Sequence, residues 1–232
     1  MGDKKLIVEN LEKIIPDIKP NRRGQPPKHP IKKYLILIIL KEIKRSPLRG
    51  AETDWSECVC GERVDHSVIH YWENNLSAEI IENAIRKAGR MLDDMLGYEF
   101  SVIDATSFSN WHMENSSFHA INRISKETVY PASITKDTLD PVPNAENAMV
   151  KGFGFLMGDK WYDVNGVFRT IFRKGYIPLI SPQRTRGKGY WRRKGRKIYS
   201  KHWRKCRQRG RGESLFGSLT TLLWRHNAYK IG

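Results

Sequence analysis

Acidic residues are scarce in the last third of this chain. Between Val164 and Gly232 the only carboxylate is Glu213, which stands in the most basic stretch of the sequence and just ahead of an apolar helical pattern. A lone acid among so many cations is either one partner of an ion pair or a ligand for a metal that acts on a polyanion.

Cysteines and long apolar runs are also rare. Three cysteines cannot form a closed disulfide framework, which favours a reducing, cytoplasmic setting. The longest apolar run, Tyr34 to Leu40, is far shorter than the ~20 residues of a membrane-spanning helix, and the N-terminus has no apolar signal core. We therefore expect a protein that is neither secreted nor embedded in a membrane.

The overall composition predicts a globular protein with an anionic partner. At 232 residues and 39% hydrophobic content, the chain can build one ordinary domain and a smaller one. Its net charge of +16 would cause strong self-repulsion unless a polyanion shared the surface. Nucleic acid is the first candidate, and an anionic membrane surface is the rival.

Residues 1–97 are predicted to form a helical DNA-binding region. Prolines and basic residues make residues 20–30 an arm between a short leading helix and a buried helix that begins at Ile31. Residues 48–74 resemble a helix-turn-helix, with one helix over 48–58 and another capped by Asp65. In that arrangement the DNA major groove would be faced by His66, Ser67 and His70. A plain three-helix bundle without base reading is the alternative.

A zinc site among Cys58, Cys60, His66 and His70 is disfavoured, because the gaps between these residues are too tight for a standard finger loop.

An amphipathic helix over residues 77–96 is predicted to connect the two halves. Residues 98–232 then follow a mixed order of strands and helices, which predicts an α/β (α+β) domain. Its strands are expected at 100–104, 116–122, 128–134, 153–158 and 177–180, with helices at 144–151 and 163–173.

The basic segment, residues 184–211, contains fourteen Lys or Arg residues and no acid. Cations neutralise phosphates, and interleaved aromatic rings can stack on bases or sugars. The alternative is a solvated loop whose aromatic residues pack onto the domain. The candidate DNA contacts in and near the segment are Lys160, Trp191, Arg192, Arg193, Lys194, Trp203, Arg209 and Arg211.

Three carboxylates distant in sequence form a candidate metal triad. Asp104 and Asp159 each follow a predicted strand, and Glu213 opens a predicted helix. Two divalent cations roughly 3.5–4 Å apart can activate the entering oxygen of a phosphodiester displacement and stabilise the leaving one. Each acid also has a purely structural interpretation, as a turn residue, a surface ion pair or a first-turn acid. Asp163 is the predicted cap of the next helix, which would leave Asp159 free to bind metal.

Three sequence blocks resemble the catalytic blocks of DDE transposases encoded by bacterial and archaeal insertion sequences, families four and five. They are Ile103-Asp104-Ala105-Thr106-Ser107-Phe108-Ser109, Gly158-Asp159-Lys160-Trp161-Tyr162-Asp163 and residues 209–219, Arg-Gly-Arg-Gly-Glu-Ser-Leu-Phe-Gly-Ser-Leu. The resemblance extends from about Gly24 to Trp224. The second and third blocks are moderately specific, and the first is weak alone.

The resemblance implies an RNase H-like catalytic domain that binds two Mg²⁺ ions, for which Mn²⁺ would substitute. Asp104 would bridge the two ions, while Asp159 and Glu213 would each hold one. The implied activity is DNA strand cleavage followed by strand transfer. The implied partners are double-stranded DNA and a second copy of the chain, in the nucleoid of a prokaryotic cell.

The chain departs from the family at three positions. The family's signature tyrosine and lysine fall at Cys206 and Thr220, and Trp161 stands where glycine is usual. These departures favour a second hypothesis, a catalytically impaired DNA-binding protein descended from a transposase. A third is a basic RNA-binding or membrane-surface protein whose acids are structural.

Overall fold

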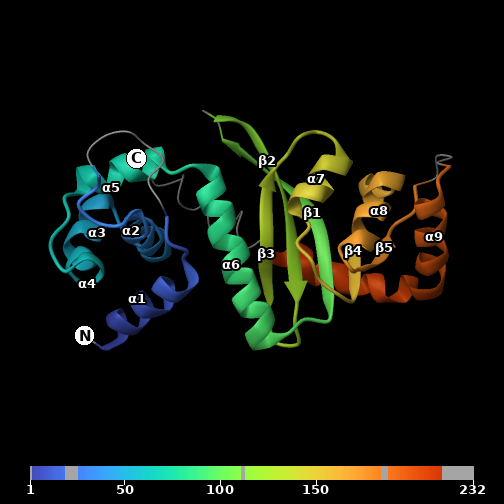
Figure 1. The fold of residues 1–232 in the computed structure, drawn as a ribbon, viewed down its shortest axis with the longest axis horizontal. Coiled ribbons are helices and arrows are strands. Elements are labelled where there is room, and N and C mark those ends of the chain that lie inside the picture. The colour runs from blue at the N-terminus through green and yellow to red at the C-terminus, as the bar shows by residue number, and fades with distance from the viewer. Residues whose placement is uncertain (1, 19–25, 111–112, 184–187, 216–232) are drawn as a thin grey trace. The chain divides into compact units, whose positions relative to one another are not determined.

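The computed structural model describes residues 2–18, 26–110, 113–183 and 188–215 (Figure 1). By compactness the chain divides into two units, Met1–Ala88 and Gly89–Gly232. This boundary lies inside α6 (Ala78–Leu96), upstream of the boundary expected after residue 97. Most of the predicted arm, residues 184–187 of the basic segment and Thr220 lie outside the described residues.

The first unit is a helical bundle around one apolar core. Its core is built from Ile36, Leu37 and Leu40 of α2 and Ile69 of α5, all fully buried. The ring of Tyr34 stacks on Trp72 at 5.4 Å between centroids, which joins the same two helices. Besides the first part of α6, the helices are α1 (Gly2–Ile14), α2 (Ile31–Lys44), α3 (Leu48–Asp54), α4 (Ser56–Cys60) and α5 (His66–Asn75).

The predicted single helix over residues 48–58 is wrong, because it is interrupted at Trp55. This residue has φ −126° and ψ −27°, outside helical values, and it separates α3 from α4. Trp55 is almost fully buried. The interruption of the helix allows the Trp55 ring to pack in the core. Sequence periodicity does not reveal such an interruption. The predicted cap of α5 is confirmed, because the Asp65 side chain accepts a hydrogen bond from the Ser67 amide.

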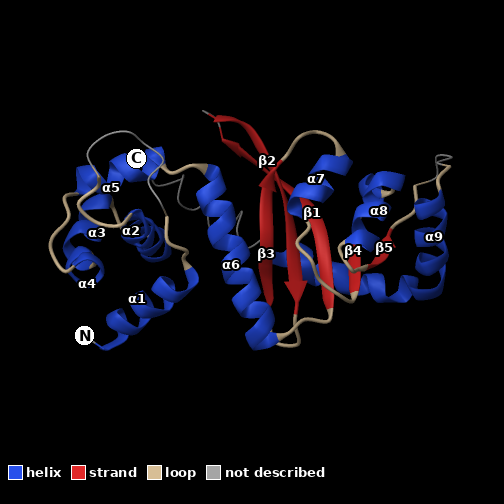
Figure 2. Cartoon of the chain, viewed as in Figure 1, coloured by secondary structure: helices blue, strands red, loops and turns tan. Residues whose placement is uncertain are grey.

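The second unit contains a five-stranded mixed sheet in the order β3-β2-β1-β4-β5 (Figure 2), which confirms the α+β class. The first three strands pair antiparallel, whereas β1, β4 and β5 run parallel. The strands are β1 (Phe100–Asn110), β2 (Met113–Ile124), β3 (Val129–Lys136), β4 (Phe155–Gly158) and β5 (Ile177–Ile180). The other elements are α7 (Pro141–Ala148), η1 (Lys160–Tyr162), α8 (Asn165–Arg173), α9 (Tyr190–His202) and η2 (Trp203–Gln208).

Alternation along the strands gives the sheet an apolar core on each face. Ile103 packs with α7 and α8 on one face. Val102, Met157 and Leu179 form the core of the other face, together with Ile198 of α9 and Cys206 of η2. The C-terminal end of the described chain crosses behind the strands in Figure 1. Both faces carry packed helices, and the candidate site lies where β4 ends beside the middle of β1.

Candidate active site

The strand expected to end at Asp104 continues to Asn110, and its register places Asp104 beside Asp159, which comes just after β4. In the parallel pair of β1 and β4, Val102 lies opposite Met157. Asp104 lies two residues after Val102, and Asp159 lies two residues after Met157. Neighbouring strands are roughly 4.8 Å apart, so both carboxylates leave the sheet at one place. Both residues line a pocket with a volume of about 410 Å³.

The two aspartates after β4 differ from the predictions made for them: Asp159 acts as a cap, and Asp163 forms ion pairs instead of capping α8. Asp159, expected to be free, accepts a hydrogen bond at 2.9 Å from the Trp161 amide and caps η1. Asp163, predicted to cap α8, does not do so, because Val164 is the N-cap residue. Asp163 is instead buried and bound by Arg192 and Arg196 at 2.7 and 2.6 Å. The Asp159 carboxylate keeps one oxygen outside this cap, and its position is fixed by the turn.

Glu213 lies in a helical stretch, residues 209–215, that packs closely on the sheet. Gly212 is buried against Val102, and its carbonyl accepts a hydrogen bond from Nδ2 of the Asn122 side chain at 3.4 Å. Arg211 donates a hydrogen bond at 3.1 Å to the carbonyl of Ser125. Val102 and Asp104 share one face of β1, so a helix seated on Val102 brings Glu213 toward Asp104.

Electrostatic interactions connect the three acids. Burial raises the pKa of Asp104, and the negative charges of Glu213 and Asp159 raise this pKa further. A hydrogen bond from the Ala105 amide and the positive charge of Arg209 act in the opposite direction. Arg209 also forms an ion pair with Glu213 at 2.7 Å, and the Glu213 side chain is 45% exposed. Glu213 is thus held by a guanidinium but remains within electrostatic range of Asp104.

A buried polar network forms another wall of the pocket. The Tyr162 hydroxyl lies 2.6 Å from Nδ1 of His119, and Nε2 of His119 lies 3.0 Å from Oδ1 of Asp137. Burial raises the pKa of Tyr162, and the negative charges of Asp104, Asp159 and Asp137 raise it further, so the hydroxyl stays protonated. The Asn144 side-chain amide also lies 3.0 Å from Nε2, so Tyr162, Asp137 and Asn144 together hold the imidazole in place. Because strand alternation gives polar residues no distinctive signal, sequence reasoning missed this network.

The carboxylate oxygens of Asp104, Asp159 and Glu213 are the kind of ligand that hard divalent cations prefer. Mg²⁺ is bound through one or two carboxylates and keeps several waters, and the site offers two aspartates in one pocket and Glu213 nearby. The carboxylate oxygens of these three residues do not all lie within 4.8 Å of one another. Ligands divided between two ions need not do so, because the ions themselves are about 3.5–4 Å apart.

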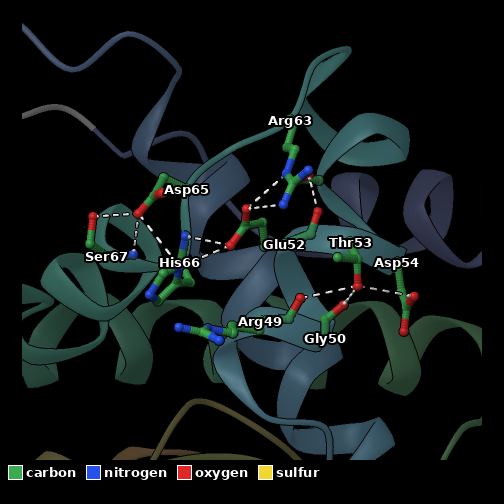
Figure 3. A network of polar contacts seen from close by, with 10 residues as sticks. Arg49, Gly50, Glu52, Thr53, Asp54, Arg63, Asp65, His66 and Ser67 are labelled. Carbon is green, nitrogen blue, oxygen red and sulfur yellow. Dashed lines mark hydrogen bonds and ion pairs between the residues drawn. The ribbon is translucent and has the colours of Figure 1, made fainter.

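Within the described part of the chain, one triplet has ligand atoms that close together: Glu52, Asp65 and His66 in the first unit. Figure 3 shows that this triplet belongs to an ion-pair network. Both oxygens of Glu52 are occupied, one by Arg63 at 2.7 Å and the other by Nδ1 of His66 at 2.9 Å. The network links α3 to the start of α5 and needs no metal.

The predicted groove-facing residues of α5 have intramolecular partners. His66 binds Glu52, and the Ser67 hydroxyl donates to Asp65 at 2.5 Å. His70 is exposed and lies 3.5 Å from Glu73. Their contacts to DNA remain a prediction; the His70 side chain is 60% exposed and that of His66 38%.

The basic segment divides into structural and exposed cations. The prediction that Arg192 contacts DNA is corrected, because its side chain is 9% exposed and makes two hydrogen bonds to Asp163. Trp191 packs on Phe172 with 5.5 Å between centroids, and Lys194 lies over both rings. The exposed candidates that remain are Lys160, Arg193, Lys194, Trp203 and Arg211.

Among the described residues, no helix is both long and apolar enough to cross a membrane. Comparisons with protein-family models, curated proteins and solved structures each find no match to this chain. The function is therefore inferred from the site itself.

Proposed function

We propose that this protein is a DNA transposase of the DDE type, which uses divalent cations to cleave DNA strands and join them. The observation that supports this most is the strand register that places Asp104 and Asp159 together, beside a helix seated on Val102 that carries Glu213. Three acids, one from the middle of β1, one just after β4 and one from a helix, lie in or near one pocket in a chain of net charge +16. A phosphodiester substrate accounts for both the acids and the surplus cations.

Each residue has a defined role in this proposal. Asp104, Asp159 and Glu213 would hold two Mg²⁺ ions, which supply activation of the attacking oxygen and stabilisation of the leaving one. The Trp161 amide keeps the Asp159 carboxylate in place. Arg209 balances the negative charge of the acids until DNA arrives, and its guanidinium then suits a phosphate oxygen. Exposed Lys160 and Arg193 would hold the strands on either side.

The proposal extends to an RNase H-like core, double-stranded DNA as substrate, a homodimer on paired ends and a place in the cytoplasmic nucleoid. The five-stranded mixed sheet is consistent with such a core. A dimer would bring two copies of the site to two DNA ends at once.

One alternative has a specific observation in its favour. Glu213 is paired with Arg209, and Cys206, at the position of the family's tyrosine, packs in the apolar core on the face of Val102. Both features suit a DNA-binding protein that has kept the fold and no longer cleaves. This alternative differs from the main proposal only in the chemistry at the site.

The test is strand cleavage of duplex fragments from the DNA that flanks the gene, with Mg²⁺ or Mn²⁺. Asp104→Ala, Asp159→Ala and Glu213→Ala should each abolish cleavage and leave DNA affinity nearly unchanged, because affinity arises from phosphate contacts. Asp94→Ala, at an exposed acid of α6, is the matched control and should cleave like the parent. Triad variants that cleave normally would refute the proposal. A parent that binds these fragments without cutting them would favour the alternative.

A further inference from the structure

Trp161 lies in an unusual position for a large aromatic residue. Its ring stacks on His119, with 5.2 Å between centroids and 17° between planes, and its edge meets Tyr162 at 5.0 Å. Even so, 37% of the residue is exposed, and it lines the pocket that contains Asp104 and Asp159. Tyr162 is perpendicular to both rings, so among the described rings only His119 stacks on a face of the indole.

The backbone ties this ring to the candidate metal ligands. The Trp161 amide donates to Oδ1 of Asp159 at 2.9 Å, so the carboxylate and the indole belong to one turn. His119, the ring beneath the indole, is buried and held between Tyr162 and Asp137. A flat ligand on the indole face opposite His119 would therefore sit at a fixed distance from a phosphate bound at Asp104 and Asp159.

The pocket has the size and lining for one base. Its volume of about 410 Å³ falls within the roughly 300–1,000 Å³ typical of small-molecule sites and is far too small for a duplex. Beside the indole it presents the hydroxyl residues Thr106 and Ser117 and the carboxylate of Asp137, which can bond to the edge of a base. Aromatic platforms stack on any base because every base has a π-face.

We propose that Trp161 is the platform for one unpaired nucleobase next to the phosphate that is cleaved. Because a base inside a duplex is already stacked on both faces, this base must leave the helix or come from a single-stranded end. The proposal rests on the proposed function, since it takes the ligand to be the DNA strand held at the acids. It adds the way in which that strand is positioned.

The first test is binding without metal, so that no cleavage takes place. Full-length parent protein is titrated with a fluorescein-labelled 12-nucleotide single strand and with an abasic strand of the same length and charge. Trp161→Ala should weaken binding of the base-containing strand by about 5- to 150-fold, the range for loss of one stacked base. Binding of the abasic strand should be unchanged, and Trp161→Phe should retain most of the preference. The control is Phe153→Ala, at an exposed aromatic residue outside the pocket, which should keep the contrast between strands.

A second measurement covers the case in which Trp161→Ala does not fold. The parent is labelled with 5-fluorotryptophan, and the ¹⁹F signal of Trp161 is assigned as the one missing from Trp161→Phe. This signal should shift on addition of the base-containing strand and stay in place with the abasic strand. Equal shifts with both strands, or no shift with either, would overturn the proposal.

The two proposals can fail separately. If the parent binds the base-containing and abasic strands equally well, the stacking site is refuted, but the proposal of metal-dependent cleavage is not affected. Normal cleavage by Asp104→Ala would remove the transposase proposal, whatever the result of the metal-free binding.

Discussion

Gly212 offers a sharp test of how Glu213 is positioned. Residues 209–215 are helical and contain two glycines, Gly210 and Gly212. A Cβ added at Gly212 would lie 2.6 Å from Cγ2 of Val102 and 2.9 Å from its Cβ, whereas one added at Gly210 would meet nothing within 4 Å. The two Gly→Ala changes are chemically identical, but only the Cβ added at Gly212 would clash with the sheet.

The expected magnitude follows from that contact. Carbon atoms pack at about 3.5–4.0 Å, so the helix must move away from Val102 by roughly 1 Å. Val102 is fully buried in the middle of the sheet and cannot yield easily. Helix propensity favours Gly→Ala by up to about 1 kcal/mol, but overpacking costs about 1–3 kcal/mol. A displacement of about 1 Å at a catalytic group lowers the rate by roughly 10²-fold.

The assay combines urea unfolding with single-turnover cleavage. We expect Gly210→Ala to be at least as stable and as active as the parent. Gly212→Ala should cleave about 10²-fold more slowly with DNA affinity unchanged. Adding Val102→Ala should restore part of this rate, because the change removes the 2.6 Å contact and leaves the one at 2.9 Å.

Equal cleavage rates for Gly212→Ala and Gly210→Ala would refute this reasoning, because Glu213 would then not depend on the contact with Val102. A double variant no faster than Gly212→Ala would refute it as well, since relief of the closest contact would have had no effect.

Two further predictions concern buried charge. Asp163→Asn should destabilise the protein by about 3–5 kcal/mol in urea, because it leaves the Arg192 guanidinium buried without its charge partner, whereas Glu146→Gln at an exposed pair should cost under about 1 kcal/mol. Burial alone would raise the pKa of Asp163, but Arg192 and Arg196 lower it. The stability that Asp163 contributes is therefore present above pH 3.8 and lost as pH falls through the folded pKa. A stability difference between Asp163→Asn and the parent that stays constant from pH 7 down to 2 would contradict this. Burial, Glu213 and Asp159 instead raise the pKa of Asp104, so metal-free Asp104→Asn should melt at a higher temperature than the parent at pH 7. That gain should shrink as pH falls through the raised pKa and vanish below 3.8, and no gain at pH 7 would contradict the raised pKa of Asp104.

Local sequence patterns predicted most of the elements in the second unit. The apolar runs before Asp104 and Asp159 and the run Ile177–Ile180 are strands, because short apolar stretches bounded by turn residues bury both faces of a sheet. The helix at Trp55 and the cap of α8 were predicted wrongly. In both cases a tertiary contact overrides local preference: Trp55 enters the core, and Asp163 binds arginines 29 and 33 residues away in sequence.

What the sequence determined by itself is the supply of chemical groups: the surplus of cations, the three isolated acids and the apolar runs that precede two of them. Periodicity is a local property, so these features can be read from short windows of the chain. Only the tertiary structure decided that Asp104 and Asp159 share one pocket, that Arg192 is an internal partner and that Trp161 lies open beside the acids. These are relations between distant segments, fixed by strand register and close packing, and no local pattern encodes them.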